Sequence, residues 1–302
     1  MLYINYEKPG HCDTLAECAS IKRSDSDVYD QVKKLKEAPE KTQRGIQSVE
    51  VAGRILEALA QRREPSALSE LAGVAALSTA QAHTYLVSLT RLGLVKRDAL
   101  TGYYEPGPLS LRLGLMFIEQ KKAYRVAAPY AAELAEKLGY SVAVCVAGAQ
   151  GPMIVRYERG AYPLHVNLHI GTVMSLRSTS TGRVFSAFLE PDKLDAMMQS
   201  QGIARLNVGL DHIDAPDGAR TESLADVRKR GMARSIDVPS PGISSLSAPV
   251  FDADRSMQLA LTVIGPSGAM DTAWKGPIAS RLGAVSQSIT DALTEGRSTH
   301  AL

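Results

Sequence analysis

The amino-acid sequence predicts an α+β protein in two parts, a small helical module followed by a larger domain of strands and helices. Three observations support this class. Apolar residues recur with a helical period between Ser48 and Gly93, and a strand-like period begins after Gly139. The chain of 302 residues, 45% of them apolar, is also long enough to build two hydrophobic cores.

The net charge of +2 conceals an uneven distribution. Residues 1–40 carry 6 basic and 8 acidic side chains (−2), residues 41–125 carry 12 and 7 (+5), and residues 126–302 carry 16 and 17 (−1). Only the middle region is basic, and a local basic excess favours contact with a polyanion.

Two classes of protein are not expected. The sequence contains no uninterrupted apolar run of about 18 residues and no basic start followed by an apolar run, so we expect a cytoplasmic chain with no membrane partner. Cys12, Cys18 and Cys145 are odd in number and widely spaced, which fits neither a disulfide framework nor a zinc finger. Residues 1–44 are polar and aperiodic, and we expect them to form a mobile extension.

Three short amphipathic helices follow the extension. Each has apolar residues at positions i, i+3, i+4 and i+7: Ala52, Ile55, Leu56 and Leu59; Leu68, Leu71, Ala72 and Ala75; and Ala82, Tyr85, Leu86 and Leu89. Pro65-Ser66 opens the second helix with Ser66 as its predicted cap, Ser78-Thr79 opens the third, and Gly93 ends it.

A hairpin is predicted directly after the third helix. Residues 94–97 and 103–105 read as two strands around the turn 98–102. Because only a tight turn separates the second and third helices, residues 45–106 are predicted to form a winged helix-turn-helix.

The third helix has the composition of a DNA-recognition helix. No acidic residue occurs from Ser78 to Lys96, whereas an ordinary surface helix mixes both signs of charge. The predicted DNA-contacting residues are Ser48, Ser78, Thr79, Gln81, His83, Thr84, Arg91, Lys96, Arg97 and Tyr103. The alternative is a three-helix packing module whose basic residues are simply solvated.

Residues 107–122 are predicted to form a linker helix. Its apolar residues lie on nearly all sides: Leu109, Leu111, Leu113, Leu115, Met116, Phe117 and Ile118. Such a helix must be buried on several sides. Burial against its twin in a dimer is favoured, and burial against its own second domain is the alternative.

The remaining residues, 123–302, alternate between strands and helices. A helix over 126–138, with Pro129 in its first turn, precedes strands at 141–147, 153–158 and 164–169. Helices follow at 180–189, 191–201 and 221–230, then an extended segment at 232–238, a hairpin of 247–251 with 259–264, and a last helix at 274–293. This irregular order predicts an α+β domain with a largely antiparallel sheet.

The run from Gly45 to Gly114 resembles the IclR family of bacterial transcriptional regulators. The similarity rests on Ile46-Gln47-Ser48-Val49, Leu68-Ser69-Glu70-Leu71-Ala72, Leu89-Thr90-Arg91-Leu92-Gly93-Leu94-Val95 and Gly102-Tyr103-Tyr104, and it extends over residues 45–295. The resemblance implies a GAF-like effector-binding domain at residues 123–302 and binding to palindromic operator DNA as a dimer or tetramer. Thr79 and Thr84 stand where the family usually has Lys and Arg, while His83 is kept; the loss of two cations should weaken phosphate binding.

Two hydroxyl-rich segments are candidates for effector binding. Residues 178–182 precede a helix, whose N-terminus attracts a carboxylate, and residues 240–247 precede a strand. Each segment alone is also explained as helix capping or as a loop. The resemblance places the effector-binding residues at Ser180, Thr181, Ser235, Ile243, Ser245 and Thr262. Compared with the family, Ser245 stands where many members have Cys, Ser235 stands where an acidic residue is usual, and Ile264 stands where a hydroxyl residue is usual. These differences favour a larger or aromatic organic acid as the effector.

Metal and catalytic sites are not predicted. His165 and His169 lie in an alternating run, where i and i+4 side chains of a strand stand about 13 Å apart, too far for one ion. Gly-x-Ser-x-Gly, Walker and HExxH motifs are absent. We therefore expect no catalytic residue and no cofactor. The resemblance implies a ligand-responsive regulator, repressor or activator, of a catabolic operon. The alternative is a small-molecule hydrolase or metal-dependent enzyme with an appended helical module.

Overall fold

The structure is a computed structural model that describes residues 45–62, 64–203 and 223–295. The predicted extension, residues 1–44, lies outside the described residues. The chain divides into two compact units: one holds the chain up to Arg91 together with Arg97–Glu105, and the other holds Leu92–Lys96 and the chain from Pro106 onward. Each unit has its own core and is described by itself.

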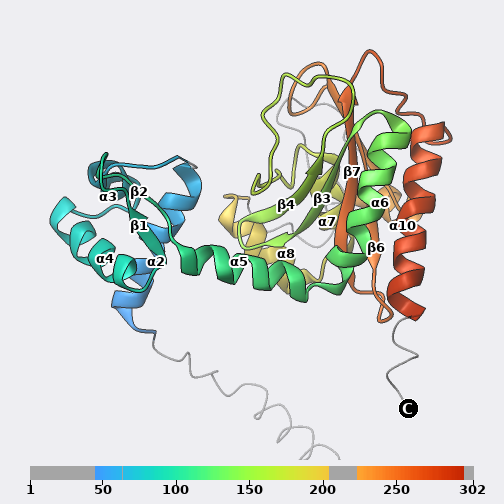
Figure 1. Cartoon of the computed structure of the whole chain (residues 1–302). Coiled ribbons are helices and arrows are strands. Elements are labelled where there is room, and N and C mark those ends of the chain that lie inside the picture. The colour runs from blue at the N-terminus through green and yellow to red at the C-terminus, as the bar shows by residue number, and fades with distance from the viewer. Residues whose placement is uncertain (1–44, 63, 204–222, 296–302) are drawn as a thin grey trace, which may run out of the picture. The chain divides into compact units, whose positions relative to one another are not determined.

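The first unit contains the three predicted helices. They are α2 (Gln47–Arg62), α3 (Leu68–Val74) and α4 (Thr79–Arg91), followed by the hairpin β1 (Val95–Arg97) and β2 (Tyr104–Pro106) (Figure 1). The helical spacing of apolar residues predicts these helices correctly, because in each helix the apolar face is the buried face. Ile55, Leu71 and Leu86 are fully buried. The helix-turn-helix and its wing are therefore confirmed.

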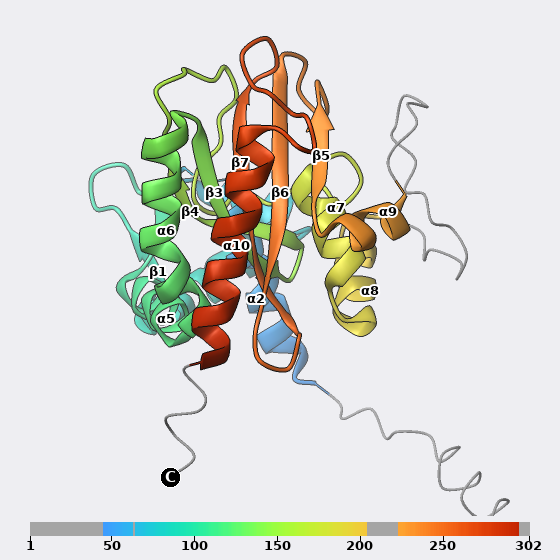
Figure 2. The ribbon, with the colours of Figure 1, turned by 90° about the vertical axis from the view of Figure 1, so that its right-hand side faces the viewer.

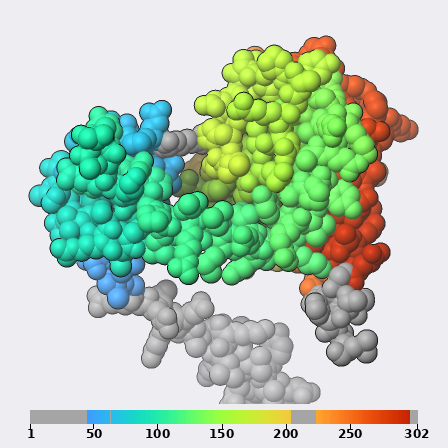
Figure 3. Space-filling view, in the orientation of Figure 1, coloured from blue at the N-terminus to red at the C-terminus, as the bar shows by residue number. Residues whose placement is uncertain are grey.

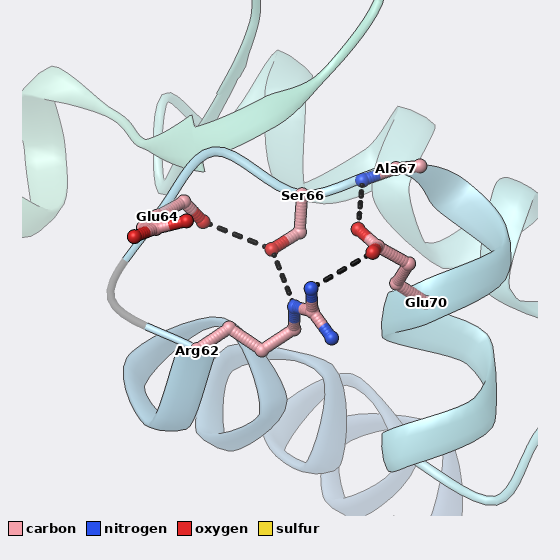
Figure 4. Close-up of polar contacts among 5 residues, drawn as sticks. All are labelled: Arg62, Glu64, Ser66, Ala67 and Glu70. Carbon is pink, nitrogen blue, oxygen red and sulfur yellow. Dashed lines mark hydrogen bonds and ion pairs between the residues drawn. The ribbon is translucent and has the colours of Figure 1, made fainter.

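Ser66 does not cap α3 as predicted. The N-cap of α3 is Ala67, whose N–H donates to Glu70 Oε2 at 2.9 Å. The buried Ser66 hydroxyl instead accepts from Arg62 Nε at 3.0 Å and donates to Glu64 O at 2.9 Å, and Arg62 also pairs with Glu70 at 2.8 Å (Figure 4). The chain enters α3 through Ser66, which forms an isolated antiparallel bridge with Tyr104 of the wing.

Ser66 also joins the helices to the wing. Its N–H donates to the carbonyl of Tyr104 at 3.0 Å, and its carbonyl accepts from the N–H of Tyr104 at 2.9 Å. Ser66 is wholly buried and Tyr104 is only 3% exposed. One serine thus fixes β2 against the start of α3 through its main chain and against α2 through its side chain.

A five-stranded antiparallel sheet forms the centre of the second unit. Its strands are β3 (Ser141–Gly148), β4 (Gly151–Glu158), β5 (Ala233–Ile236), β6 (Ile243–Phe251) and β7 (Met257–Pro266), in the order β4-β3-β7-β6-β5. The β3–β4 and β6–β7 hairpins lie where the sequence predicts hairpins, although their strands are longer than predicted, and the pairing of β5 with β6 was not predicted. The mixed content of helices and antiparallel strands confirms the α+β class.

Helices cover both faces of this sheet (Figures 1 and 2). On one face α6 (Lys122–Leu138) and α10 (Pro277–Glu295) pack over a core that contains Val144, Leu261 and Val263. On the other face α7 (Ser180–Phe188), α8 (Pro191–Ser200) and α9 (Leu224–Arg230) pack over Cys145 and Ile264. Burial of both faces explains why the central strands read as nearly continuous apolar runs.

The linker helix α5 (Pro108–Gln120) has no buried residue in the single chain. Its large apolar side chains are about half exposed, with Leu111 at 64%, Leu115 at 55% and Phe117 at 48%. The surface of this segment is drawn in green in Figure 3. The described residues of one chain therefore do not cover the apolar side chains of α5, whose burial the sequence predicts.

Several predicted boundaries are wrong. Residues 164–169 form no strand, because their main chain turns locally: Leu168 N donates to Val166 O and His169 N to Thr172 Oγ1. Helix α6 begins at Lys122, which places Pro129 inside it. Strand β6 begins at Ile243, so the serines read as a loop lie in a strand. Helix α9 begins at Leu224 after its cap Ser223, and residues 221–222 lie outside the described residues.

Candidate functional site

The first turn of α4 is organised by a reciprocal cap. Gln81 N donates to Ser78 Oγ at 3.3 Å, while Gln81 Oε1 accepts from Ser78 N at 3.2 Å and from Ser78 Oγ at 3.0 Å. This capping box satisfies orphan groups at the start of the helix. Both side chains are exposed, and the Gln81 amide keeps its NH₂ donors for an outside acceptor.

The outward side of α4 is polar, exposed and free of carboxylates. Thr79, His83, Thr84 and Arg91 are all exposed, as sequence reasoning required. The Thr84 hydroxyl donates to Ala80 O at 3.1 Å, so its proton is used within the helix and the oxygen remains as an acceptor. Arg91 supplies a cation to the last turn of the helix.

The wing carries the other predicted contacts. Lys96 and Arg97 are exposed on β1, and Tyr103 is 44% exposed beside the turn. The Arg97 guanidinium is oriented by two contacts: its Nε donates to Gly102 O at 3.2 Å, and its Cζ lies 5.7 Å from the centroid of the Tyr104 ring. Ser48 is exposed as the second residue of α2. Cations, amide, imidazole and hydroxyl groups of this kind suit phosphates and base edges.

The hydroxyl-rich segment before α7 is a helix start, as predicted. Thr179 is the N-cap, and its side chain accepts from Gly182 N at 2.9 Å. The next two residues, Ser180 and Thr181, are completely buried and face the sheet. A Cβ at Gly182 would stand 2.1 Å from the carbonyl oxygen of Ser175, so only glycine allows this close approach.

Strands β6 and β7 bring the other predicted hydroxyls to the same place. Ser180 Oγ lies 2.7 Å from Ser245 Oγ, and Thr181 Oγ1 lies 2.8 Å from Thr262 Oγ1. We call Ser180, Thr181, Ser245, Ser247 and Thr262 the hydroxyl cluster. The paired residues are far apart in the sequence: 65 positions separate Ser180 from Ser245, and 81 positions separate Thr181 from Thr262. They meet because the start of α7 packs on one face of the sheet.

Ser235 and Ile243 flank the hydroxyl cluster. Ser235 pairs in register with Ser245 across β5 and β6, and its hydroxyl contacts Val238 O at 2.6 Å and Ser178 O at 3.2 Å. Ile243 is 8% exposed and belongs to the same apolar core as Ile264. The structure thus collects all six predicted effector residues on one side of the sheet.

Ser247 lies in the predicted hydroxyl-rich segment but was not assigned to the site, and Cys145 was missed. Thr262 donates to Ser247 Oγ at 2.9 Å, which extends the chain of hydroxyls. Burial raises the pKa of the Cys145 thiol to about 12, although hydrogen bonds with Thr181 and Thr262 oppose the shift. The signal was present in the alternation of β3 and β6, where both residues fall on the same face as Thr262.

Arg183, on the first turn of α7, was also missed. Its side chain is only 7% exposed, its Nη1 donates to Arg234 O at 2.7 Å, and its Nε has no hydrogen-bond partner in the described structure. Burial lowers the pKa of this guanidinium. No carboxylate of the described residues pairs with it, which leaves a positive potential at the start of α7.

The histidines form no metal centre within the described part of the chain, where no group of three or more His, Cys, Asp or Glu could hold an ion. His165 Nε2 contacts Pro241 O at 3.0 Å and His169 Nδ1 contacts Ile170 O at 2.9 Å. The strand geometry used to separate them was wrong. Among the described helices none is long and apolar enough to cross a membrane.

Two family models match the chain. Residues 48–99 match the IclR helix-turn-helix domain, and residues 117–291 match the bacterial transcriptional regulator IclR C-terminal domain.

Individual proteins show the same similarity. A glycerol operon regulatory protein of Streptomyces griseus is 30% identical over 224 residues, which are 74% of this chain and 86% of that protein. The crystal structure of Pseudomonas aeruginosa HmgR is 30% identical, covers 82% of this chain and 98% of its own, and has a TM-score of 0.50. An IclR homolog of Microbacterium hydrocarbonoxydans, solved in complex with 4-hydroxybenzoate, shares the fold with 16% identity, a TM-score of 0.65, and coverage of 82% of this chain and 98% of its own.

Proposed function

The chain belongs to the IclR family of bacterial transcriptional regulators, and from this membership we propose that it binds a palindromic operator as a dimer or tetramer and senses a small organic acid. The family and its relatives are DNA-binding regulators with a ligand-binding domain and not enzymes. We further propose that it controls, as repressor or activator, a catabolic operon near its gene. The proposed boundaries remain 45–106 for the DNA-binding domain, 107–122 for the linker helix and 123–302 for the effector domain.

The carboxylate-free outer side of α4 is the observation that carries the DNA-binding proposal. We assign base contacts to Gln81 and His83, and phosphate contacts to Arg91, Lys96 and Arg97. Ser48, Ser78, Thr79, Thr84 and Tyr103 complete the interface with hydroxyl groups. Because Thr79 and Thr84 carry no charge, few cations are available per half-site, and tight binding requires two copies of the module.

The exposed linker helix supports the oligomer. A helix with apolar residues on every side and none of them buried in one chain needs a partner surface. Pairing of two α5 helices would cover these side chains and place two α4 helices on one palindrome. Two-fold symmetry of the protein then matches the two-fold symmetry of the site.

The hydroxyl cluster supports the effector site. An entering carboxylate can replace the hydroxyl–hydroxyl contacts of Ser180 with Ser245 and of Thr181 with Thr262, because each hydroxyl has a proton to donate. The N-terminus of α7 and the buried Arg183 both favour a negative charge there. We assign Ser180, Thr181, Ser235, Ser245 and Thr262 to the polar end of the ligand and Ile243 to its apolar end.

An aromatic acid is the ligand class that fits best. Ile243 and Ile264 give the site apolar walls. Ser235 replaces the acidic residue that is usual in the family, so no carboxylate at this position repels an anionic ligand. The Microbacterium homolog holds 4-hydroxybenzoate on the same fold, which supports this class. Ligand changes DNA affinity only through its different affinities for the two arrangements of the DNA-binding modules.

A gel-shift experiment tests the proposal. The full chain with DNA from upstream of its own gene should give a specific, salt-sensitive complex at submicromolar protein. Random DNA of the same length is the control. Absence of a specific complex up to micromolar protein would overturn the regulator assignment.

A further inference from the structure

A cavity of about 660 Å³ lies where the linker helix meets the effector domain. Its walls come from the end of α5, the start of α6, the β3–β4 turn, α8, the β6–β7 hairpin and the end of α10. It shares no residue with the hydroxyl cluster or with Ser235 and Ile243. Its size is within the range of pockets that hold small ligands.

Two lysines give this cavity an unbalanced positive charge. Lys121 Nζ lies 4.9 Å from the centroid of the Phe117 ring, and Lys122 Nζ donates to Leu293 O at 3.2 Å. Neither lysine pairs with a carboxylate of the described residues. Lys193, which also lines the cavity, is compensated by Glu190 at 2.8 Å.

The carboxylate that lines the cavity does not cancel this charge locally. Asp252 is engaged in its own turn, where its Oδ1 accepts from Asp254 N at 3.0 Å and from Ser256 N at 2.9 Å, and its Oδ2 accepts from Gln258 Nε2 at 2.7 Å. Helix α6 starts in the cavity wall, and no side chain caps it. Its positive end adds to the potential of the two lysines.

The remaining wall is largely apolar. Its apolar lining residues are Phe117, Tyr124, Val146, Met197, Met257 and Leu259. Methionine side chains are flexible and adapt to apolar groups of different shapes. A ligand that uses both features of the cavity has an apolar body and one negative charge.

We propose that this cavity is a second ligand site, which binds a small amphiphilic carboxylate with its charge between Lys121 and Lys122 and its apolar body against the methionines. The site lies at the break between α5 and α6, where Lys121 leaves helical geometry with φ −81° and ψ 96°. An occupant contacts both helices and so fixes the angle at which the linker leaves the effector domain. Binding here does not depend on the hydroxyl cluster being the effector site.

Calorimetric titration of the full chain with octanoate tests the proposal, with octan-1-ol as the uncharged match. Lys121→Gln/Lys122→Gln should weaken octanoate binding about tenfold, which corresponds to about 1.4 kcal/mol. Lys137→Gln/Lys275→Gln removes the same charge from exposed positions outside the cavity and should leave binding unchanged. Ala196→Trp, at an exposed position of the wall, should block binding while the chain stays folded by circular dichroism.

Ser245→Leu separates this site from the proposed effector site. We expect octanoate to bind Ser245→Leu as it binds the parent chain. Octanoate binding that is lost in Ser245→Leu and kept in the lysine variant would overturn the second site. So would equal affinities for octanoate and octan-1-ol, or no detectable octanoate binding. Failure of the operator experiment leaves each of these readouts unaffected.

Discussion

Gln81 and Ser78 bind each other through three hydrogen bonds at the start of α4: the Gln81 side-chain oxygen accepts two of them and the Ser78 hydroxyl oxygen accepts the third. Two residues assigned separately to DNA contact therefore act as one unit. The cap leaves the NH₂ of Gln81 as the group that faces outward, which orients this amide before DNA arrives.

Ser78→Ala should destabilise the recognition helix and weaken DNA binding together. Loss of the cap hydroxyl costs about 1 kcal/mol of helix stability. It also frees Gln81 to rotate, so discrimination between operator and mutated operator should fall. Amide exchange of α4 and gel shifts measure the two effects. Ser88→Ala, on the same helix but away from its start, is the control; unchanged discrimination in Ser78→Ala would contradict the orienting role.

His83→Ala should change sequence preference without changing stability. The imidazole is exposed, so its removal should leave the packing of the fold unchanged. Arg91→Ala should instead lower affinity for all sequences and reduce the slope of log K against log salt by about 0.9 per chain. Competition gel shifts at several salt concentrations separate the two. Identical behaviour of both variants would refute the division into base and phosphate contacts.

Ser66→Ala should loosen the wing and α3 together. The change removes the two hydrogen bonds of the buried hydroxyl, with Arg62 Nε and with Glu64 O, each of which contributes about 0.5–1.5 kcal/mol. Exchange of the β2 and α3 amides, followed by mass spectrometry, should be faster. Ser69→Ala, at the exposed second residue of α3, should have little effect. Equal exchange in both variants would show that the contacts in Figure 4 contribute nothing.

Ser245→Leu should abolish effector binding. Leucine fills the space beside Ser180 and removes a donor from the proposed carboxylate site. In a thermal-shift screen of aromatic and aliphatic acids, a ligand that raises the melting temperature of the parent chain should not raise that of Ser245→Leu. Ser288→Leu, exposed on α10, is the control. Stabilisation that persists in Ser245→Leu would place the effector elsewhere.

Cys145 should resist thiol reagents at neutral and mildly alkaline pH, because burial raises its pKa to about 12 and keeps it protonated. The unfolded chain releases this proton near its ordinary pKa of 9.0, whereas the folded chain holds it up to about 12. The free energy of unfolding should therefore fall with rising pH across that window. Cys145→Ala should lack this component of the pH dependence; alkylation of folded Cys12→Ser/Cys18→Ser would contradict the prediction.

The helical module was predictable because its helices are separate and amphipathic, so that the apolar spacing of α2, α3 and α4 reports burial directly. The wing followed from its turn residues. The actual role of Ser66, which joins α2 to the wing instead of capping α3, could not be read from the sequence, because its partners Arg62 and Tyr104 are set by the packing of three elements.

The second unit was harder to predict for a different reason. Leu164, Val166 and Leu168 alternate as in a strand, yet they pack against the core from a coil whose hydrogen bonds are local. The serines of β6 look like a loop, but each hydroxyl finds a partner from another element: Ser244 meets Ser267, Ser245 meets Ser180 at the start of α7, and Ser247 meets Thr262. Pairing such as that of Thr181 with Thr262 depends on strand register and not on spacing along the chain.

The uncovered side chains of α5 have a consequence for mass action. If the paired state alone hides them, folding of this segment is coupled to association, and dilution acts as a denaturant. The melting temperature of the chain should then rise with protein concentration, and the operator should stabilise the dimer by the same free energy with which dimer formation strengthens operator binding.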